Sequence, residues 1–313
     1  MTTIGEAQVP ALLAAFDLGS WGRLSDGPSA SGRVGSIWRL DAEVGAWAVK
    51  QVGDASPEIL EGAAFQETAH AAGVPTPAVR RTQAGELIAD VGGVRVRVLE
   101  WVDLEAADVG LDPIELGRVL AGLHRVPFRG SVGVDPWYSE PVGDRRWAEL
   151  VGSLRARDAP FADELAAVVP ELLVLEGLLG APPRSLRTCH RDLWADNVRR
   201  TPGGGLCVFD FDNAGLADPS QELARVLVED ATLDPKRAPT IRAAYADAGG
   251  PGRVEGPRDF ALPIAQLGHI VAEGCRRWLA AVTGAERADN EGWVREFLDR
   301  PLTRSVIETL LTG

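Results

Sequence analysis

Residues 190–197 read His-Arg-Asp-Leu-Trp-Ala-Asp-Asn, and residues 208–212 read Val-Phe-Asp-Phe-Asp. The first stretch has the His-Arg-Asp-x-x-x-x-Asn spacing of a phosphoryl-transfer catalytic loop. In the second, Asp210 directly follows an apolar run, so its carboxylate is expected at the mouth of a buried strand. Asp192 is suited to orient an attacking hydroxyl or accept its proton, whereas Asn197 and Asp210 offer the oxygen ligands that Mg²⁺ prefers. Together they predict a site where a cation holds phosphate beside a catalytic carboxylate.

A single lysine in a predicted strand is the second chemical signal. Lys50 and Lys236 are the only lysines, and the other 30 of the 32 lysine and arginine residues are arginine. Lys50 lies in the middle of 47–52, an apolar run typical of a strand. It is either an ordinary lysine that faces water or a cation that binds the α- and β-phosphates of a nucleotide. We favour the second interpretation, because this chain uses arginine wherever a plain positive charge suffices.

A helix is predicted at 58–72, directly after this strand, where a proline precedes it and a Gly-Val-Pro sequence ends it. Its Glu61 is our choice for the ion-pair partner of Lys50. Two other glutamates of the helix, Glu58 and Glu67, are alternatives, and each of the three also fits an ordinary solvated helix position.

A glycine-containing hairpin is predicted before the Lys50 strand. Residues 31–40 read Ser-Gly-Arg-Val-Gly-Ser-Ile-Trp-Arg-Leu, and the glycines suit a turn whose backbone N–H groups approach phosphate. We assign that contact to Gly32, Gly35 and Ser36. The full Gly-x-Gly-x-x-Gly pattern is missing, so an ordinary hairpin also fits these residues.

A connector follows a second predicted hairpin, whose strands are 87–91 and 94–99. The second strand alternates apolar and basic residues, so its arginines are expected to face water. The connector contains Glu100, Trp101 and Val102, and its backbone is expected to hydrogen-bond the edge of an adenine. We place a lobe boundary here, between an N-lobe of residues 1–101 and a C-lobe of residues 102–313.

Composition narrows the class of protein. The 313 residues are 45% hydrophobic and 25% charged, which is ordinary for a globular chain long enough for one large core or two lobes. The net charge of −13 argues against nucleic acid or an anionic membrane as main partner. No apolar run approaches the roughly 20 residues that span a bilayer, and the N-terminus lacks a basic signal region. Three unclustered cysteines suggest reduced thiols in the cytoplasm.

The chain beyond residue 102 is expected to be mainly helical, and the acceptor is expected between the catalytic loop and the C-terminal helices. Acidic groups there would suit a cationic acceptor, although each residue taken singly fits a solvated helix face. The candidates are Asp212, Glu229, Asp230, Glu273 and Trp278, and beyond them Asp289, Glu291 and Trp293. Two other residues are predicted to be structural: His124 at a helix end, and Asp218 as a loop brace.

In their order along the chain, these motifs resemble the aminoglycoside phosphotransferase superfamily of small-molecule kinases. The resemblance covers most of the chain and implies an α+β, protein-kinase-like fold, with a small β-rich N-lobe and a larger, mainly helical C-lobe. It also implies ATP, or GTP, and Mg²⁺ as cofactors. By the same resemblance Asp192 is the catalytic aspartate, Asn197 and Asp210 are the metal ligands, and Lys50 with Glu61 is the phosphate-positioning pair.

Two departures from related sequences bear on the function. Asp212 stands where a protein kinase has the glycine of Asp-Phe-Gly, and no Ala-Pro-Glu follows, which argues against a regulated protein kinase. Arg191 stands where many small-molecule kinases have glycine.

We therefore expect an enzyme, an O-phosphotransferase that acts on a hydroxyl of an aminoglycoside-type antibiotic or amino sugar. Homoserine, choline and macrolides remain open as acceptors. The rivals are a protein kinase and an inactive nucleotide-binding scaffold. A monomer or weak homodimer is expected.

Overall fold

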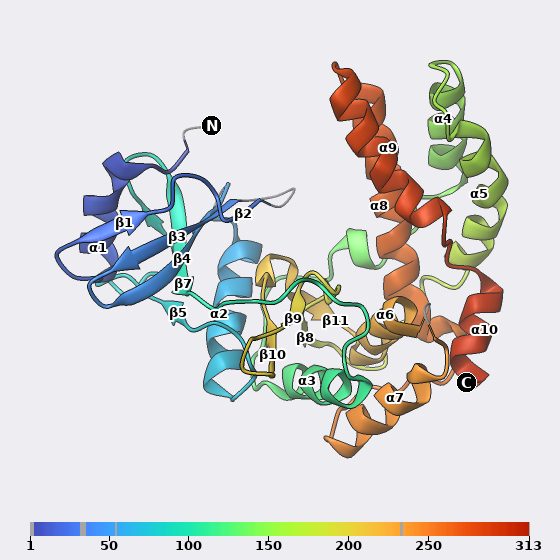
Figure 1. The fold of residues 1–313 in the computed structure, drawn as a ribbon. Coiled ribbons are helices and arrows are strands. Elements are labelled where there is room, and N and C mark those ends of the chain that lie inside the picture. Colours follow the sequence, from blue (N-terminus) through green and yellow to red (C-terminus); the bar gives the residue numbers. More distant parts are fainter. Residues whose placement is uncertain (1–2, 32–35, 54, 232–233, 313) are drawn as a thin grey trace. The chain divides into compact units, whose positions relative to one another are not determined.

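The computed structural model describes residues 3–31, 36–53, 55–231 and 234–312. It forms two compact units, each built from several stretches of the chain: unit 1 contains residues 1–111, 125–132 and 192–215, and unit 2 contains residues 112–124, 133–191 and 216–313. Unit 1 carries the main β-sheet and unit 2 is mainly helical (Figure 1). The predicted fold class, with a β-rich N-terminal part and a helical C-terminal part, is confirmed.

An antiparallel sheet forms the centre of unit 1. Its strand order is β1-β3-β4-β7-β5, with β2 paired to β3 and β6 paired to β7. The bounds are β1 Gly22–Leu24, β2 Ala30–Ser31, β3 Ser36–Ala42, β4 Gly45–Gln51, β5 Val79–Arg80, β6 Ala89–Asp90 and β7 Arg95–Glu100. The three long strands, β3, β4 and β7, confirm the strands predicted at 37–40, 47–52 and 94–99.

The register of the sheet brings two cations together. Lys50 on β4 pairs directly with Arg97 on β7, and directly opposite residues of neighbouring strands point to the same face. The adjacent pair, Val49 and Val98, points to the other face and belongs to the hydrophobic core that α1 (Val9–Phe16) covers. The sequence alternation therefore assigns valines to the core and basic groups to the opposite face.

Helix α2 (Pro57–Ala71) follows β4, as predicted. Ser56 caps its N-terminus by accepting a hydrogen bond from the Ile59 amide, and proline occupies the first turn. Within α2, Gly62 lies against the backbone of η3, a 3₁₀ turn at Phe211–Asn213: a Cβ atom on Gly62 would lie 2.2 Å from the Phe211 carbonyl oxygen. The absence of a side chain at Gly62 sets how closely η3 approaches α2.

A short hairpin completes unit 1. Strands β9 (Val198–Arg200) and β10 (Leu206–Val208) pair in antiparallel register. The Val208 amide donates to the Pro75 carbonyl, 2.8 Å away, so the hairpin joins the extended segment that follows α2.

Unit 2 is built from helices α3 (Pro113–Arg125), α4 (Asp144–Arg155), α5 (Ala162–Glu176), α6 (Pro219–Ala231), α7 (Arg237–Asp247), α8 (Ala261–Ala280), α9 (Gly284–Leu298) and α10 (Arg304–Thr312). Two short strands, β8 (Arg187–Cys189) and β11 (Gly215–Ala217), pair with each other. The largest hydrophobic core of unit 2 joins α4, α5, α8 and α9 through residues such as Trp147, Leu165, Val271 and Val294. No helix in the described ranges is long and apolar enough to cross a membrane.

The C-terminal part of unit 2 consists of two helices, α9 and α10, with Pro301 in the break between them. Proline has no amide hydrogen and its ring clashes with the preceding turn, so a helix does not continue through it. Helix α9 begins at Gly284, where Thr283 and Glu286 form a capping box.

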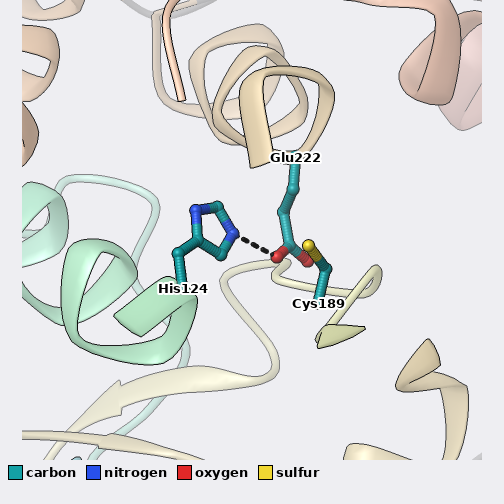
Figure 2. A group of neighbouring side chains, drawn as sticks. All are labelled: His124, Cys189 and Glu222. Atoms are coloured by element: carbon teal, nitrogen blue, oxygen red, sulfur yellow. Dashed lines mark hydrogen bonds and ion pairs between the residues drawn. The ribbon is translucent and has the colours of Figure 1, made fainter. Parts of the chain in front are cut away.

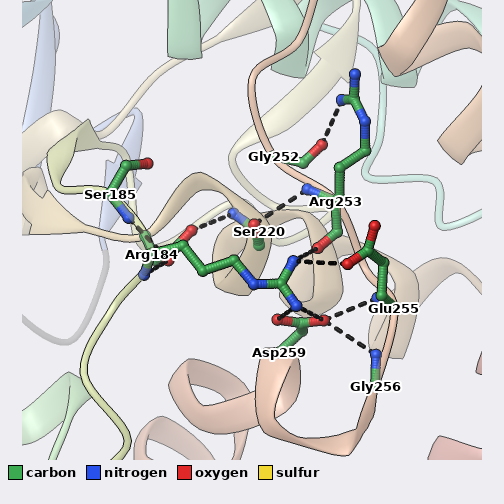
Figure 3. A network of polar contacts seen from close by, with 9 residues as sticks. Arg184, Ser185, Ser220, Gly252, Arg253, Glu255, Gly256 and Asp259 are labelled. Carbon is green, nitrogen blue, oxygen red and sulfur yellow. Dashed lines mark hydrogen bonds and ion pairs between the residues drawn. The ribbon is translucent and has the colours of Figure 1, made fainter.

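A polar network in unit 2 ties loops to the start of α6 (Figure 3). Asp218 accepts hydrogen bonds from the Ser220 amide at 2.8 Å and from the Arg184 amide at 2.6 Å. The Arg184 side chain in turn pairs with Glu255 and Asp259. Asp218 is thus a loop brace, as the sequence predicted.

Candidate active site

The β9–β10 hairpin brings the predicted metal ligands to one end of unit 1. Val198 pairs with Val208, and the next bond is donated by the Phe209 amide to the Asn197 carbonyl, at 3.1 Å. Asn197 enters the hairpin and Asp210 leaves it at this same end. Two residues separated by the whole hairpin are therefore neighbours through the antiparallel register.

The carboxylate of Asp192 is held by three side-chain donors. Trp194 Nε1 donates to Oδ1 at 2.6 Å, while Nδ2 of Asn197 and Nδ2 of Asn213 donate to Oδ2 at 3.1 and 3.0 Å. Asn197 also donates to the Asp192 carbonyl, at 2.8 Å. These bonds fix the rotamer of Asp192. The sequence did not predict that Trp194 and Asn213 contact Asp192. The one available signal was the position of Trp194, a side chain with an N–H donor two residues after Asp192 in the same loop.

Asp210 has an unusual backbone and a partly open side chain. Its φ is 61°, in the left-handed region, and its side chain is 41% exposed. Its Oδ1 lies 2.7 Å from Lys50 Nζ. The strained conformation turns the chain sharply at the end of β10 and directs it into η3.

Lys50 is enclosed in unit 1, with a side chain only 6% exposed. Besides Asp210, it contacts Oδ2 of Asp212 at 2.6 Å. An ordinary water-facing strand lysine is therefore excluded. Burial of an ammonium group is costly unless carboxylates accompany it, and two are present.

The expected partner of Lys50, Glu61, is engaged elsewhere in unit 1. Its Oε2 accepts hydrogen bonds from the Ser131 amide at 2.6 Å, the Ser131 hydroxyl at 3.0 Å and the Val132 amide at 3.1 Å. The expectation of a Lys50–Glu61 pair is therefore not met in this structure. The physical reason is that η3 supplies nearer carboxylates to Lys50, while Glu61 satisfies donors of the loop at 131–132.

The burial of Arg97 contradicts a second expectation, that the arginines of β7 face water. The alternation in the sequence suggested that the arginines of β7 face water, yet the Arg97 side chain is 0% exposed and its Nη2 lies 2.8 Å from Oδ1 of Asp212. Arg95, in contrast, is exposed. Strand β7 is buried on both faces over four consecutive residues. The alternation of apolar and basic residues shows that the arginines face away from the core, but it does not show whether that second face is exposed to water or covered by protein.

The predicted nucleotide contacts are described only in part. Gly32 and Gly35 lie outside the described residues, and Ser36 is the first residue of β3. In the connector, the Glu100 amide donates to Ala78 at 2.8 Å and the Trp101 amide to Ala46 at 3.1 Å. Both N–H groups are thus used within unit 1.

The predicted acceptor residues are mostly paired with arginine. Asp212 contacts Lys50 and Arg97, as described above. Four other candidates lie in unit 2. Asp230 pairs with Arg237 at 2.8 Å, Glu229 lies 3.7 Å from Arg225, and Glu273 binds both Arg276 and Arg277. Trp278 is a core residue whose ring lies edge-on to that of Phe161. The hydrogen bond from Arg276 lowers the pKa of Glu273. None of the three acids in unit 2 supplies an unpaired carboxylate for a cationic acceptor.

A buried network in unit 2 holds the backbone of His190 and Arg191, and Figure 2 shows the His124 and Glu222 side chains of this network. Nε2 of His124 lies 2.7 Å from Glu222, and its Nδ1 lies 2.7 Å from the Tyr245 hydroxyl. Glu222 also accepts the amide hydrogen bonds of His190 and Arg191. Burial opposes ionisation of Glu222, but the hydrogen bond and charge of His124 and the Arg191 amide lower its pKa below the usual value.

Cys189 lies beside this network, and His124, Cys189 and Glu222 are close enough together to be considered as a metal site. Burial raises the pKa of the Cys189 thiol well above its usual value, so the thiol stays protonated. Both nitrogens of His124 are already hydrogen-bonded. These hydrogen bonds favour a structural brace, and a structural role for His124 stays a prediction.

Arg191 adopts φ of 64°, where residues with a Cβ atom are strained. Its guanidinium lies 4.2 Å from the centre of the Tyr138 ring, and Gln266 donates to its carbonyl at 3.1 Å. The positive φ gives a physical reason for glycine at this position in many small-molecule kinases.

Comparison with known proteins identifies the family. The pattern that defines the phosphotransferase enzyme family matches residues 29–260. The chain belongs to this family. The resemblance noted from the motifs is thereby confirmed, as is the prediction of an enzyme of the small-molecule kinase class.

Solved structures of similar fold extend over almost the whole chain. A spectinomycin phosphotransferase in complex with ADP and spectinomycin has a TM-score of 0.69 and 15% identity, and covers 99% of this chain and 98% of its own. An aminoglycoside phosphotransferase from Alicyclobacillus acidocaldarius has a TM-score of 0.64 and 18% identity, with 100% and 98% covered. A choline/ethanolamine kinase family protein from Mesorhizobium loti has a TM-score of 0.58 and 16% identity, with 98% and 99% covered. No curated protein matches the chain by sequence.

Proposed function

We propose that this phosphotransferase moves the terminal phosphate of ATP, or of GTP, to a hydroxyl group of a small molecule in a Mg²⁺-dependent reaction. The observation that carries the proposal is the carboxylate of Asp192, fixed by three donors beside the hairpin end that joins Asn197 and Asp210. A carboxylate held in one rotamer next to oxygen ligands is what in-line transfer to an alcohol requires.

Each residue has a separate task in this proposal. Asp192 orients the acceptor hydroxyl and accepts its proton. Lys50 attracts phosphate oxygens, and its position inside unit 1 keeps that charge away from bulk water. Asn197 and Asp210 fit Mg²⁺, because an amide and a carboxylate are oxygen ligands and Asp210 is open to solvent. Bound there, Mg²⁺ neutralises charge on the transferring phosphate.

The nucleotide is proposed to bind through an N-lobe of residues 1–101, with Gly32, Gly35, Ser36 and the connector Glu100–Val102 near its phosphates and base. The acceptor is proposed to bind the C-lobe, residues 102–313. We further propose a cytoplasmic enzyme that is a monomer or weak homodimer, in keeping with three buried, free cysteines.

For the acceptor we put an aminoglycoside-type antibiotic or amino sugar first. The spectinomycin phosphotransferase and an amicoumacin kinase of similar fold (TM-score 0.60, 13% identity) support an antibiotic. The choline/ethanolamine kinase neighbour supports an amino alcohol as the second candidate. Because the acidic candidates in unit 2 are paired with arginine, charge alone does not select a cationic acceptor, and macrolides and homoserine also remain candidates.

The test is acceptor-dependent ADP production in a coupled assay. The purified protein is incubated with ATP or GTP and Mg²⁺ against aminoglycosides, amino sugars, choline, ethanolamine, homoserine, macrolides and generic protein acceptors. We expect turnover with one class of small hydroxylated molecule and none after Mg²⁺ is chelated. Phosphorylation of protein acceptors alone would contradict the proposal, and so would turnover that is unaffected by chelation.

A further inference from the structure

A buried charge cluster lies on the face of the sheet opposite the core of unit 1. Asp212 bridges two cations, with Oδ2 at 2.6 Å from Lys50 Nζ and Oδ1 at 2.8 Å from Arg97 Nη2. The side chains of Lys50, Arg97 and Asp212 are 6%, 0% and 11% exposed. Each oxygen of this carboxylate is therefore committed to a different cation in a region that water hardly reaches.

Asp210, the second carboxylate that contacts Lys50, is more exposed to solvent than Asp212. Asp210 is 41% exposed and has been assigned above to Mg²⁺, so it is the group that exchanges partners during the reaction. Asp212 is enclosed and contacts cations of the chain itself on both sides. Of the two, only Asp212 is suited to hold Lys50 throughout a reaction cycle.

We propose that Asp212, anchored by Arg97, is the positioning residue that fixes Lys50, in place of a glutamate from α2. This inference rests on the proposed function, in which Lys50 contacts nucleotide phosphates. It reassigns Asp212 from the acceptor site to the phosphate site. It also gives a role to Arg97, whose side chain was expected from the sequence pattern to be exposed to water.

The second cation has a clear electrostatic effect. A lone Lys50–Asp212 pair would be neutral and would offer phosphate little attraction. With Arg97 added, the three groups carry a net charge of +1, so the charge of Lys50 remains effective toward an anion while its ammonium group is held in place. The sheet register enforces this arrangement, because Lys50 and Arg97 are directly paired on β4 and β7.

The first test is a double-mutant cycle on nucleotide affinity, with ADP and Mg²⁺ as the probe in titration calorimetry. Asp212→Asn keeps the shape and removes the charge, and should weaken ADP binding about tenfold or more, the range for a charge-assisted hydrogen bond. Lys50→Met should weaken it similarly. The double variant should bind no more weakly than Lys50→Met alone, because Asp212 acts through Lys50.

Two substitutions of Arg97, one that removes its charge and one that keeps it, extend this test. Arg97→Met should weaken ADP binding, whereas Arg97→Lys should retain most of it, because a single Nη2 contact joins Arg97 to Asp212. Asp41→Asn is the control: it breaks a solvent-exposed Arg39–Asp41 pair of similar length, 2.9 Å, on β3, and should leave ADP affinity unchanged. Full affinity in Asp212→Asn, or strictly additive losses in the double variant, would overturn the proposal. So would a loss that saturating Mg²⁺ restores, since Asp212 would then be a metal ligand.

The small number of lysines allows a readout that needs no nucleotide. Because Lys50 and Lys236 are the only lysines, ¹⁵N-lysine labelling of a Lys236→Arg protein leaves one ammonium signal. Ion-paired and enclosed, this signal should exchange slowly with water, and Asp212→Asn should accelerate the exchange in a protein whose circular dichroism is unchanged. An unchanged exchange rate would overturn the inference.

The two readouts separate this inference from the proposed function. A wild-type protein that binds neither ADP nor ATP contradicts the proposed function, and with it the phosphate role of Lys50. A wild-type protein that binds ADP, together with an Asp212→Asn variant that binds equally well, removes only the role of Asp212.

Discussion

Two residues at or next to the proposed site residues Asp192 and Asp210 carry backbone strain. Arg191 and Asp210 have φ values of 64° and 61°, and a left-handed conformation costs a residue with a Cβ atom about 1–2 kcal/mol. Arg191 directly precedes Asp192, and its amide is held by Glu222. Strain of this kind persists only where the surroundings determine the backbone, as several hydrogen bonds do here.

Substitution of Arg191 tests that strain. Arg191→Gly should be more stable than Arg191→Ala by about 1 kcal/mol, because glycine adopts a positive φ without penalty. Both variants lose the contact of the guanidinium with Tyr138, so this loss cancels in the comparison. Denaturant unfolding of the two purified variants measures the difference. An alanine variant that equals or exceeds the glycine variant in stability would mean that Arg191 is unstrained.

At the level of elements, α2 and η3 are joined by a close backbone approach. Gly62→Ala should destabilise the protein by about 1–3 kcal/mol, the usual cost of overpacking, because its Cβ would lie 2.2 Å from the Phe211 carbonyl oxygen. The matched control is Gly152→Ala in α4, where nothing lies within 4 Å of the new Cβ. That exposed change should stabilise by about 0.5–1 kcal/mol, as expected for alanine in a helix.

Opposite signs in thermal unfolding of these two variants would support the approach of η3 to α2. If Gly62→Ala also stabilised the protein, the packing would be wrong. Because η3 contains Asp212, Gly62→Ala should in addition weaken ADP binding, whereas Gly152→Ala should not.

The Glu222 network links α3, α6 and α7 to the backbone of residues 190 and 191. Glu222→Gln should destabilise the protein at neutral pH by about 1–3 kcal/mol, because Glu222 is hydrogen-bonded to His124 and accepts from the amides of His190 and Arg191 in a buried position. The folded-state pKa of Glu222 lies below its usual value of 4.5. Its contribution is therefore present above pH 4.5 and is lost as the pH falls through the lower, folded-state pKa.

Denaturant unfolding at several pH values checks this linkage. From pH 7 to below pH 4.5, the wild-type protein should lose more stability than Glu222→Gln does, because the variant has no proton to take up at this position. Parallel losses in the two proteins would show that Glu222 is not ionised in the fold.

For the whole molecule, the sequence predicted the fold class, the long strands of the sheet and the α2 helix. These predictions succeeded because they depend on local patterns: strand-length apolar runs and a proline at a helix start. The roles of Asp192, Asn197 and Asp210 stay predictions, although the hairpin brings the backbones of Asn197 and Asp210 to the same end.

The expectations for Glu61 and Arg97 failed for one reason, which is dependence on contacts distant in the sequence. Glu61 was paired with Lys50 because both are typical of a kinase-like fold, yet η3 supplies the carboxylates that Lys50 contacts. Arg97 was expected to be exposed because its strand alternates apolar and basic residues. This alternation does not reveal whether protein covers the second face of the sheet. The acceptor candidate Glu273, in contrast, is paired within its own helix, with Arg276 and Arg277 three and four residues away.

The most direct measurement is the turnover of Asp192→Asn against that of Asp196→Asn, with ATP, Mg²⁺ and the acceptor found in the panel. Asp196 is the matched control, since it lies in the same loop and is exposed. We predict that Asp192→Asn loses about 10²–10⁴-fold in kcat, the usual contribution of a positioned base, with ADP affinity and unfolding temperature retained, while Asp196→Asn remains close to wild type. A folded Asp192→Asn protein with near wild-type turnover would contradict the assignment of Asp192 as the catalytic carboxylate.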